Sequence, residues 1–315
     1  FKIEDILEEV DDPYEIWPLQ CVKRVRSLGL RAALVPEAFP IGIADVLRAD
    51  GVELTVEQRH FDDRRRAKSN AALAGIWRAQ EAAQAGITAV AEALRRSQPA
   101  DGGRELDGAP LTCEHLKLLA TDAFGALGCR GDDLVVAHGE QAANGHEGGS
   151  GRVRNDDVVL CDFFPRHIES GYHGDMTRTF RLGEFDDALT AWHADCLDAL
   201  DLAISMVRPG ASGADMHRAV SQLFEQRGHA TELSHPDGEP LRHGFYHSLG
   251  HGVGLDVHEA PGLGRTGQPL VRGDVIALEP GLYQPGFGGV RIEDVVVVTD
   301  DGCEVLGTFP RGLEP

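Results

Sequence analysis

The chain has 315 residues and a formal net charge of −21, with 42% apolar and 26% charged residues. This length predicts about two domains, and the apolar content is ordinary for a globular protein. The negative charge argues against a nucleic-acid-binding protein, which needs a basic face. No apolar run approaches the roughly 20 residues that cross a bilayer, and no signal-peptide pattern opens the chain. A cytoplasmic protein that binds neither membranes nor nucleic acids is therefore expected.

The six cysteines are scattered along the chain, and no two of them have Cys-x-x-Cys spacing. A structural zinc cluster or a disulfide framework is therefore not expected, and reduced thiols are the simplest interpretation. The first residue is Phe1 and not Met, which leaves open whether the natural protein starts earlier.

Residues 1–66 are predicted to form a small α/β unit. Strand-like runs at 31–36 and 51–56 flank a short helical pattern at 43–49. This unit is short for an independent domain, so we interpret it as the remaining part of a larger one.

A cluster of charged residues at 62–68 marks the expected domain boundary, after which residues 67–315 form the larger domain. An alanine-rich segment at 69–97 has apolar residues at helical spacing, which predicts a long helix. A second helix is expected at 112–127, with Thr112 as its N-cap.

The rest of the chain alternates strand and helix signals. Strands are predicted at 133–138, 157–164, 172–182, 274–279, 289–298 and 304–306, and helices at 186–207 and 213–227. A glycine-rich loop at 139–151 carries His146 but lacks the ending of a nucleotide-binding P-loop. The order helix, helix, strands occurs twice, over 69–182 and 186–306, which favours two similar halves facing each other across a central site.

Four histidines lie close together in the second half, interleaved with glycines at 250, 252 and 254. They are His243, His247, His251 and His258. Imidazole is the commonest metal ligand and a proton carrier at neutral pH, and glycine lets the backbone approach a ligand closely. A functional site is one interpretation, and a loop of solvated histidines is the other.

Two pairs of carboxylates stand at the ends of apolar strands. Asp162 and Asp175 form one pair, and Glu279 and Glu293 form the other. If each pair lies in an antiparallel hairpin, its two carboxylates can share one face. Such charges are costly beside apolar strands unless they bind a cation. Two divalent metals with one histidine would balance them, Mn²⁺ first and Co²⁺ or Zn²⁺ as alternatives, whereas surface acids at strand ends are the other interpretation.

At these residues the sequence resembles the creatinase/methionine-aminopeptidase (M24) metallopeptidases, and within them the Xaa-Pro branch of aminopeptidase P and prolidase. The resemblance covers roughly 66–310. It is carried by Asp162, the block Asp-Met-Thr-Arg-Thr-Phe at 175–180, the histidine segment 247–261, Glu-Pro-Gly at 279–281 and Arg-Ile-Glu at 291–293.

The resemblance implies an α+β pita-bread catalytic domain with two pseudo-symmetric halves, preceded by part of a smaller α/β N-terminal domain. It implies five metal ligands at matching positions: Asp162, Asp175, His251, Glu279 and Glu293. The implied substrate-side residues are His146, His247, His258 and Arg291, and His243 is left without a role. A homodimer is also implied.

The implied activity is hydrolysis of the Xaa-Pro bond at the N-terminus of short proline-containing peptides or dipeptides. A hydroxide bridging two metals would attack the carbonyl, and Glu279 would shuttle the proton. His247 and His258 would hydrogen-bond the carbonyl oxygen or the tetrahedral intermediate. Arg178 is interpreted as a structural charge partner of the carboxylates.

One departure from the family pattern concerns specificity. Prolidases often carry an arginine soon after His-Glu-x-Pro, whereas here Gly262 stands there and the nearest arginine is Arg265. Both an aminopeptidase and a dipeptidase therefore stay open. Because one fold hosts many functions, a non-catalytic binding protein or a hydrolase of a small non-peptide substrate stays open as well.

Overall fold

The structure is a computed structural model that describes residues 6–7, 9–145, 147–184, 187–236 and 239–315. The chain divides into two compact units, Phe1–Arg65 and Arg66–Pro315, one residue before the boundary expected from the charged cluster. No helix among the described residues is long and apolar enough to cross a membrane.

The first unit contains a parallel pair of strands joined by a helix. The two predicted strands and the helix between them are confirmed as β1 (Ala32–Val35), β2 (Glu53–Val56) and α3 (Ile41–Ala49). The strands pair in parallel. Helix α2 (Pro13–Ser27) was not expected. Val22 is its one buried residue, so its sequence shows no clear apolar stripe at helical spacing. Helix α4 (Gln58–Arg66) leads into the second unit.

The first half of the second unit packs two helices on a three-stranded antiparallel sheet. The predicted helices are confirmed as α5 (Asn70–Arg96) and α6 (Cys113–Ala126), and Thr112 caps α6 by accepting from the His115 N–H. The sheet has the order β10-β8-β7, with β7 at Val135–His138, β8 at Asp157–Phe163 and β10 at Met176–Leu182.

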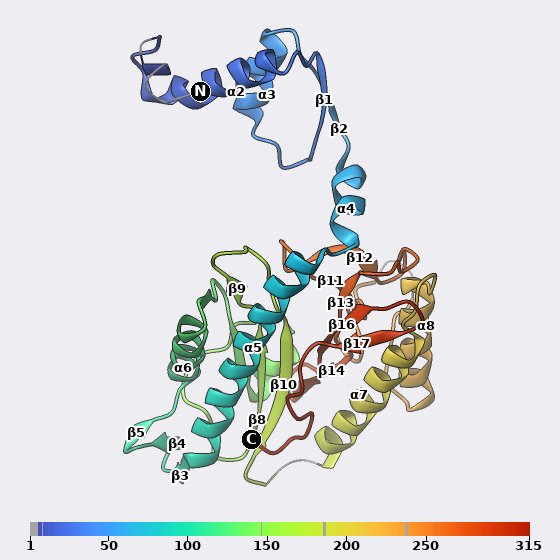
Figure 1. Cartoon of the computed structure of the whole chain (residues 1–315). Helices are drawn as coiled ribbons and strands as arrows, with labels where there is room; N and C mark the ends of the chain where they lie inside the picture. Colours follow the sequence, from blue (N-terminus) through green and yellow to red (C-terminus); the bar gives the residue numbers. More distant parts are fainter. Residues whose placement is uncertain (1–5, 8, 146, 185–186, 237–238) are drawn as a thin grey trace. The chain divides into compact units, whose positions relative to one another are not determined.

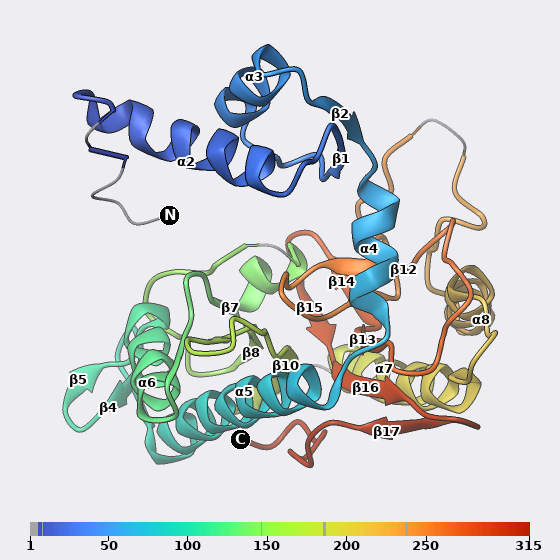
Figure 2. The same ribbon diagram turned by 45° about the horizontal axis from the view of Figure 1, so that its top comes forward.

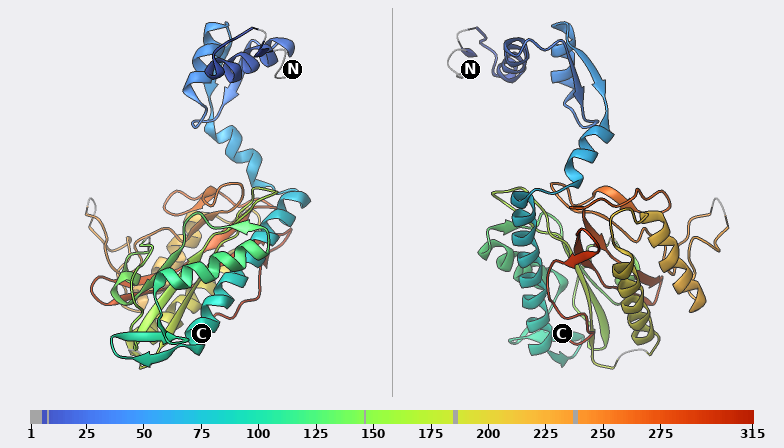
Figure 3. Two further views of the ribbon diagram at one scale, coloured as in Figure 1. Left: turned by 90° about the vertical axis from the view of Figure 1, so that its left-hand side faces the viewer. Right: turned by 45° about the vertical axis from the view of Figure 1, so that its right-hand side comes forward.

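The second half repeats this order with helices α7 (Asp187–Met206) and α8 (Gly213–Gln226). Its sheet has the order β12-β11-β13-β16-β17. The bounds are β11 Gly250–Gly252, β12 Glu259–Leu263, β13 Val275–Leu278, β16 Asp294–Val298 and β17 Cys303–Val305. Figures 1, 2 and 3 show the two helix pairs on opposite sides of the strands.

The prediction of a single strand at 289–298 is wrong, because the chain changes its pairing strand within this segment. Strand β15 (Gly288–Arg291) pairs with β14 (Gly281–Gln284), whereas β16 pairs with β13. The chain crosses from one ladder to the other at residues 292–293. This crossing matters for the site, because Glu293 lies on it.

The remaining elements are short. They are β3 (Gln98–Ala100), β4 (Gly103–Leu106), β5 (Ala109–Pro110), β6 (Cys129–Arg130), β9 (Arg166–His167) and the 3₁₀ helix η1 (Gly139–Ala143), which opens the glycine-rich loop.

Strand β8 is buried on both faces, since its side chains alternate between two apolar cores. Val158 and Leu160 join the core that contains α7 and α8, whereas Val159, Cys161 and Phe163 join the core of α5 and α6. The strands thus form the middle layer of the unit, between its two helix pairs.

Candidate metal centre

The antiparallel pairing of β8 and β10 places the first two carboxylates on one face. Asp162 lies opposite Thr177, and Asp175 precedes Thr177 by two residues, so all three share that face. The side-chain amide of Gln80, on α5, holds the backbone of Asp175: its Oε1 accepts from the Asp175 N–H and its Nε2 donates to the Asp175 carbonyl, both at 2.9 Å.

The other two carboxylates lie at one end of the ladder of β13 and β16. Leu278 pairs with Asp294 as the last pair of this ladder. Glu279 directly follows β13 and Glu293 directly precedes β16, so both lie just beyond that pair. The Thr177 hydroxyl donates to Glu293 Oε2 at 2.7 Å, and the Glu293 N–H donates to the Thr177 carbonyl at 3.2 Å. Thr177 therefore joins the two carboxylate pairs across the halves.

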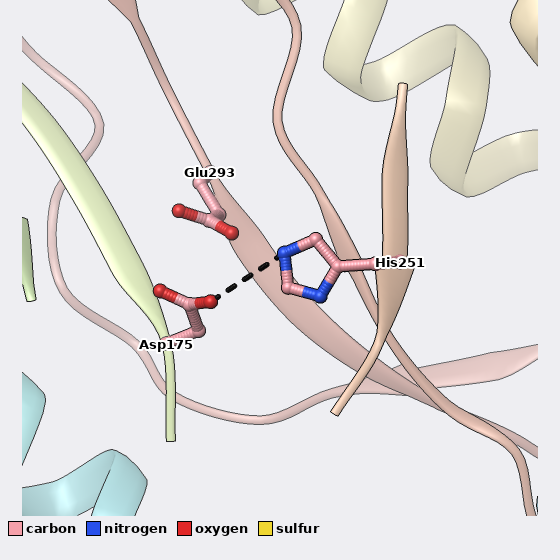
Figure 4. Close-up of side chains that lie close together, drawn as sticks. All are labelled: Asp175, His251 and Glu293. Atoms are coloured by element: carbon pink, nitrogen blue, oxygen red, sulfur yellow. Dashed lines mark ion pairs between the residues drawn. The ribbon is translucent and has the colours of Figure 1, made fainter. Parts of the chain in front are cut away.

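His251 reaches this cluster from β11. Its Nε2 lies 3.7 Å from Asp175 Oδ2 and 3.6 Å from Glu279 Oε1. Ligand atoms of Asp175, His251 and Glu293 all lie within 4.8 Å of one another, and Figure 4 shows the three side chains converging.

Glycines on both sides of His251 allow β11 to fit between its neighbours. A Cβ at position 250 would lie 1.9 Å from the Ala277 carbonyl oxygen, and one at position 252 would lie 2.4 Å from that of Ala260. Larger residues at these positions would push β11 away. The glycines found in the sequence thus place the histidine.

Charge in the cluster is concentrated and poorly solvated. Burial, together with the neighbouring carboxylates, raises the pKa of Asp175 and of Glu293 well above the ordinary values. Burial lowers the pKa of His251, so its neutral form, which binds metals, is favoured.

Arg291 is the cation that contacts the cluster directly. Its Nη2 donates to Asp162 Oδ2 at 2.6 Å, its Nε donates to the Thr177 hydroxyl at 3.1 Å, and its Nη1 donates to the Tyr283 hydroxyl at 2.9 Å. Its Nε also lies 3.9 Å from Glu279 Oε2.

Arg178 pairs with Asp294, the residue that follows Glu293. Its Nη2 donates to Asp294 Oδ1 at 2.8 Å, and its Nη1 donates to the backbone carbonyl of Glu293 at 2.6 Å. Arg178 therefore acts as a structural residue beside the cluster, as the sequence indicated, and supports Glu293 through its backbone carbonyl.

The cluster lies in a cavity of about 690 Å³, which also includes His247 and His258. His247 donates from Nδ1 to the Ser248 carbonyl at 2.8 Å, and its Nε2 is 3.0 Å from the Tyr283 hydroxyl. The His258 ring lies edge-on to His251, with the ring centroids 4.2 Å apart. His243 is exposed, in agreement with its lack of a role.

A family model, that of metallopeptidase family M24, matches residues 74–300. The chain belongs to this family. Its M24 relatives include the probable dipeptidase PepE of Mycobacterium tuberculosis, 34% identical over 57% of this chain and 45% of that protein. Another is the Xaa-Pro dipeptidase of Pyrococcus furiosus, 31% identical over 58% of this chain and 49% of that protein. The chain spans about half the length of the curated relatives it matches.

Solved structures of M24 proteins have the same architecture. The Xaa-Pro dipeptidase of Bacillus anthracis is 25% identical, with a TM-score of 0.78 over 95% of this chain and 78% of that one. The X-Pro aminopeptidase of Thermotoga maritima, 24% identical, has a TM-score of 0.75 over 96% of this chain and 80% of that one. The predicted α+β pita-bread fold is confirmed.

The residues present fit the divalent metal that an M24 metallopeptidase uses. Oδ1 of Asp162 and Oδ1 of Asp175 are buried and have no hydrogen-bond partner, and buried polar atoms are normally satisfied. A cation beside these oxygens would complete their coordination. The donor set of carboxylates with one imidazole suits Mn²⁺ and related ions.

The structure brings together most of the residues that the sequence singled out. The five expected ligands, His247, His258 and Arg291 all face one cavity, whereas His146 lies outside the described residues. Sequence reasoning missed Gln80 and Tyr283. Tyr283 lies close to the Glu-Pro-Gly block and could have been noticed, but no pattern marks Gln80, which is 95 residues from Asp175.

Proposed function

We propose that this chain is a metal-dependent peptidase that hydrolyses the Xaa-Pro bond at the N-terminus of short peptides. The observation that carries this proposal is the convergence of Asp162, Asp175, His251, Glu279 and Glu293 at one cavity. The relatives named Xaa-Pro dipeptidase and X-Pro aminopeptidase support the substrate class.

The proposed ligands are these five residues, holding two divalent ions. Bound ions of this kind supply a Lewis acid and lower the pKa of a bound water to about 7. Mn²⁺ is our first choice, with Co²⁺ or Zn²⁺ as alternatives. Arg291, with its donors engaged by Asp162, Thr177 and Tyr283, would hold the carboxylates in place rather than contact the substrate.

Within this reaction, Glu279 would take the proton of the attacking water and give it to the leaving nitrogen. Its carboxylate lies 3.6 Å from His251 Nε2 and 4.0 Å from His247 Nδ1, within reach of both a proposed metal ligand and a proposed substrate-side histidine. His258, which is exposed, is the better donor to the carbonyl oxygen. His247 would have to break its bond to Ser248 or Tyr283 before it could contact substrate.

Two substrate classes are compatible with this site, dipeptides and longer peptides. Arg265 is the arginine nearest in sequence to the position where prolidases hold the free carboxylate of a dipeptide. Its Nε lies 2.5 Å from Glu232 Oε2, so a substrate carboxylate would have to compete with Glu232 for it. The test is turnover of an Xaa-Pro dipeptide and of an Xaa-Pro-Yaa tripeptide by the Mn²⁺-loaded chain. Cleavage of the dipeptide alone identifies a dipeptidase, and cleavage of the tripeptide identifies an aminopeptidase.

A chain that binds no divalent metal, or that cleaves neither peptide when loaded with Mn²⁺, would refute the peptidase proposal. Metal content is measured by elemental mass spectrometry on the purified chain. Turnover with metal bound, lost on chelation and restored by Mn²⁺, is the expected result.

For the whole protein, we propose that residues 1–66 are part of an α/β N-terminal domain and that residues 67–315 are the catalytic domain. We also propose a homodimer that works in the cytoplasm. Light scattering coupled to size-exclusion chromatography measures the mass in solution, and a value near that of one chain would contradict the dimer.

A further inference from the structure

A buried lysine–glutamate pair lies outside the metal centre, next to the turn that carries His258. The Lys68 Nζ is 2.5 Å from Glu259 Oε1, and the two side chains are 2% and 4% exposed. Residue 68 precedes the stretch matched by the family model, which begins at residue 74. The role of Lys68 must therefore be sought in its contacts.

Glu259 is the centre around which the turn at 254–258 folds. Its Oε2 accepts from the backbone N–H groups of Leu255 at 3.1 Å and Asp256 at 3.5 Å. Gly254 leaves room for the carboxylate, since a Cβ there would lie 2.3 Å from Glu259 Oε1. Glu259 also pairs with Gly252 across the ladder of β11 and β12. The turn thus closes on a buried negative charge.

This turn sets the position of His258, which directly precedes Glu259. The His258 ring lies against that of His251 at a centroid distance of 4.2 Å. Any shift of the turn relative to β11 changes this distance. The geometry of the catalytic cavity therefore depends on how firmly the Glu259 carboxylate is held.

Lys68 delivers its ammonium group from a backbone that is fixed on both sides. Its N–H donates to the Gly273 carbonyl at 3.1 Å, and Ser69 caps helix α5. Two residues earlier, Arg66 donates to both carboxylate oxygens of Asp274, at 2.6 and 3.0 Å. The backbone that carries the Lys68 side chain is thus held in place by hydrogen bonds on both sides.

We propose that Lys68 is a positioning residue for hydrolysis. Its ammonium group neutralises the buried Glu259 carboxylate. The carboxylate then holds the turn at 254–258, which keeps the His258 ring against the His251 ring. This inference rests on the proposed function, in which His258 contacts the reacting carbonyl. Without the ammonium group, Glu259 becomes an uncompensated buried charge. The turn then opens to let water reach the carboxylate, and His258 loses its place.

The first test is Lys68→Met in the full chain, which keeps most of the side-chain length and removes the charge. We expect kcat to fall about 10- to 100-fold, less than the 10²–10³-fold loss typical of deleting a transition-state donor, with bound metal unchanged. Lys117→Met is the matched control, since that lysine donates to the Gly149 carbonyl at 2.8 Å away from the turn. The control should keep kcat within about twofold.

A double-mutant cycle with His258→Ala separates positioning from general damage. If Lys68 acts through His258, Lys68→Met has no further effect on kcat once His258 is removed. A loss of the same size in both backgrounds would overturn the proposal.

Hydrogen exchange gives a readout that does not depend on activity. Lys68→Met should speed amide exchange in residues 254–259 and leave α5 and α6 unchanged, whereas unchanged exchange in the turn would overturn the proposal. If the wild-type chain cleaves no Xaa-Pro peptide, the proposed function fails, yet this measurement still decides the role of Lys68. Should Lys68→Met not fold, the double variant Lys68→Met/Glu259→Gln removes both charges and takes its place. Because no charge is then left uncompensated, this variant should fold and its exchange in residues 254–259 should stay close to that of the wild type, whereas failure of the double variant to fold as well would overturn the proposal.

Discussion

Asp175 shows why the centre of this molecule favours a cation. Its side chain is 5% exposed, and its Oδ1 has no hydrogen-bond partner. Burial, and then the charges of Glu293, Asp162 and Glu279, raise its pKa. Without metal the folded chain therefore holds mutually repelling groups close together, and metal binding relieves this repulsion.

Replacing Asp175 by Asn should separate the stability of the metal-free and the metal-loaded chain. With a chelator present, the variant should unfold at the same temperature as the wild type or higher, because one repelling charge is gone. Metal at 100 times its Kd stabilises a folded protein by about 2.7 kcal/mol, and the variant should lose most of this gain. Calorimetry with EDTA and with Mn²⁺ measures both terms, and an equal gain in the two proteins would contradict Asp175 as a ligand.

Replacing Glu279 by Gln tests the proton shuttle. Turnover of the Xaa-Pro substrate should fall by at least about 10²-fold, since general acid–base groups contribute 10²–10⁴-fold. Glu105→Gln is a control of the same chemistry at a half-buried ion pair with Arg152, outside the cavity, and should leave turnover unchanged. Near-normal turnover of Glu279→Gln, measured alongside its metal content, would exclude Glu279 as the shuttle.

At this scale the sequence predicted residues that belong to ordered motifs and missed those that act from far along the chain. Asp162 and His251 stand in recognisable patterns, at strand ends or between glycines. Gln80 and Lys68 act on partners 95 and 191 residues away, and no local pattern reports such contacts. Arg178 likewise pairs with Asp294, 116 residues away, a partner that the sequence analysis could not name.

Among the elements, helices α5 and α6 lie close together at Gly86. A Cβ at this position would lie 2.4 Å from Cε1 of Phe124, on α6, and 3.2 Å from Cδ2 of Phe163, on β8. Glycine is unfavourable inside a helix by roughly 0.5–1 kcal/mol relative to alanine. Its presence here is explained by the close approach of the two phenylalanine rings.

The substitution Gly86→Ala should therefore destabilise the chain, although alanine is the better helix former. Overpacking of a core typically costs about 1–3 kcal/mol, and denaturant unfolding measures this loss. Gly125→Ala, within α6 and with nothing within 4 Å of the added carbon, should instead leave stability unchanged or raise it by up to about 1 kcal/mol. If both substitutions have the same sign, close packing at Gly86 is not the cause.

Elements with one clear periodicity were predictable, and elements defined by a change of partner were not. The helical spacing at 69–97 predicted α5 to within a residue at each end. The apolar run at 289–298 looks like one strand, yet it divides into β15 and β16 because two different ladders compete for it. The local sequence indicates whether a segment is extended. Which strand the segment pairs with depends on the rest of the sheet.

For the whole second unit, Arg178 links the two halves. It lies on β10, in the first half, is 1% exposed, and donates to Asp294 on β16, in the second half. It also donates to the carbonyls of Phe309 and Pro310. A single side chain thus satisfies backbone and carboxylate acceptors from both halves.

Arg178→Met should lower the free energy of unfolding by about 3–5 kcal/mol, because Asp294 is left buried with less compensating charge. Arg181→Met, on the same strand, breaks a solvent-exposed pair with Glu314 and should cost about 0–1 kcal/mol. Urea unfolding of both variants, with the wild type alongside, measures the difference. Equal losses would show that the contact between the halves does not depend on Arg178.

The bond between Arg291 and Asp162 has a consequence for how the protein is made. The two residues are 129 positions apart, and the proposed ligands from the two halves are similarly distant. Contacts of such long range form late in folding, after the costs of closing long loops are met. Because synthesis runs from the N-terminus, β8 and β10 are made before Glu279 and Glu293 exist. The complete set of proposed ligands can therefore bind metal only after both halves have been translated.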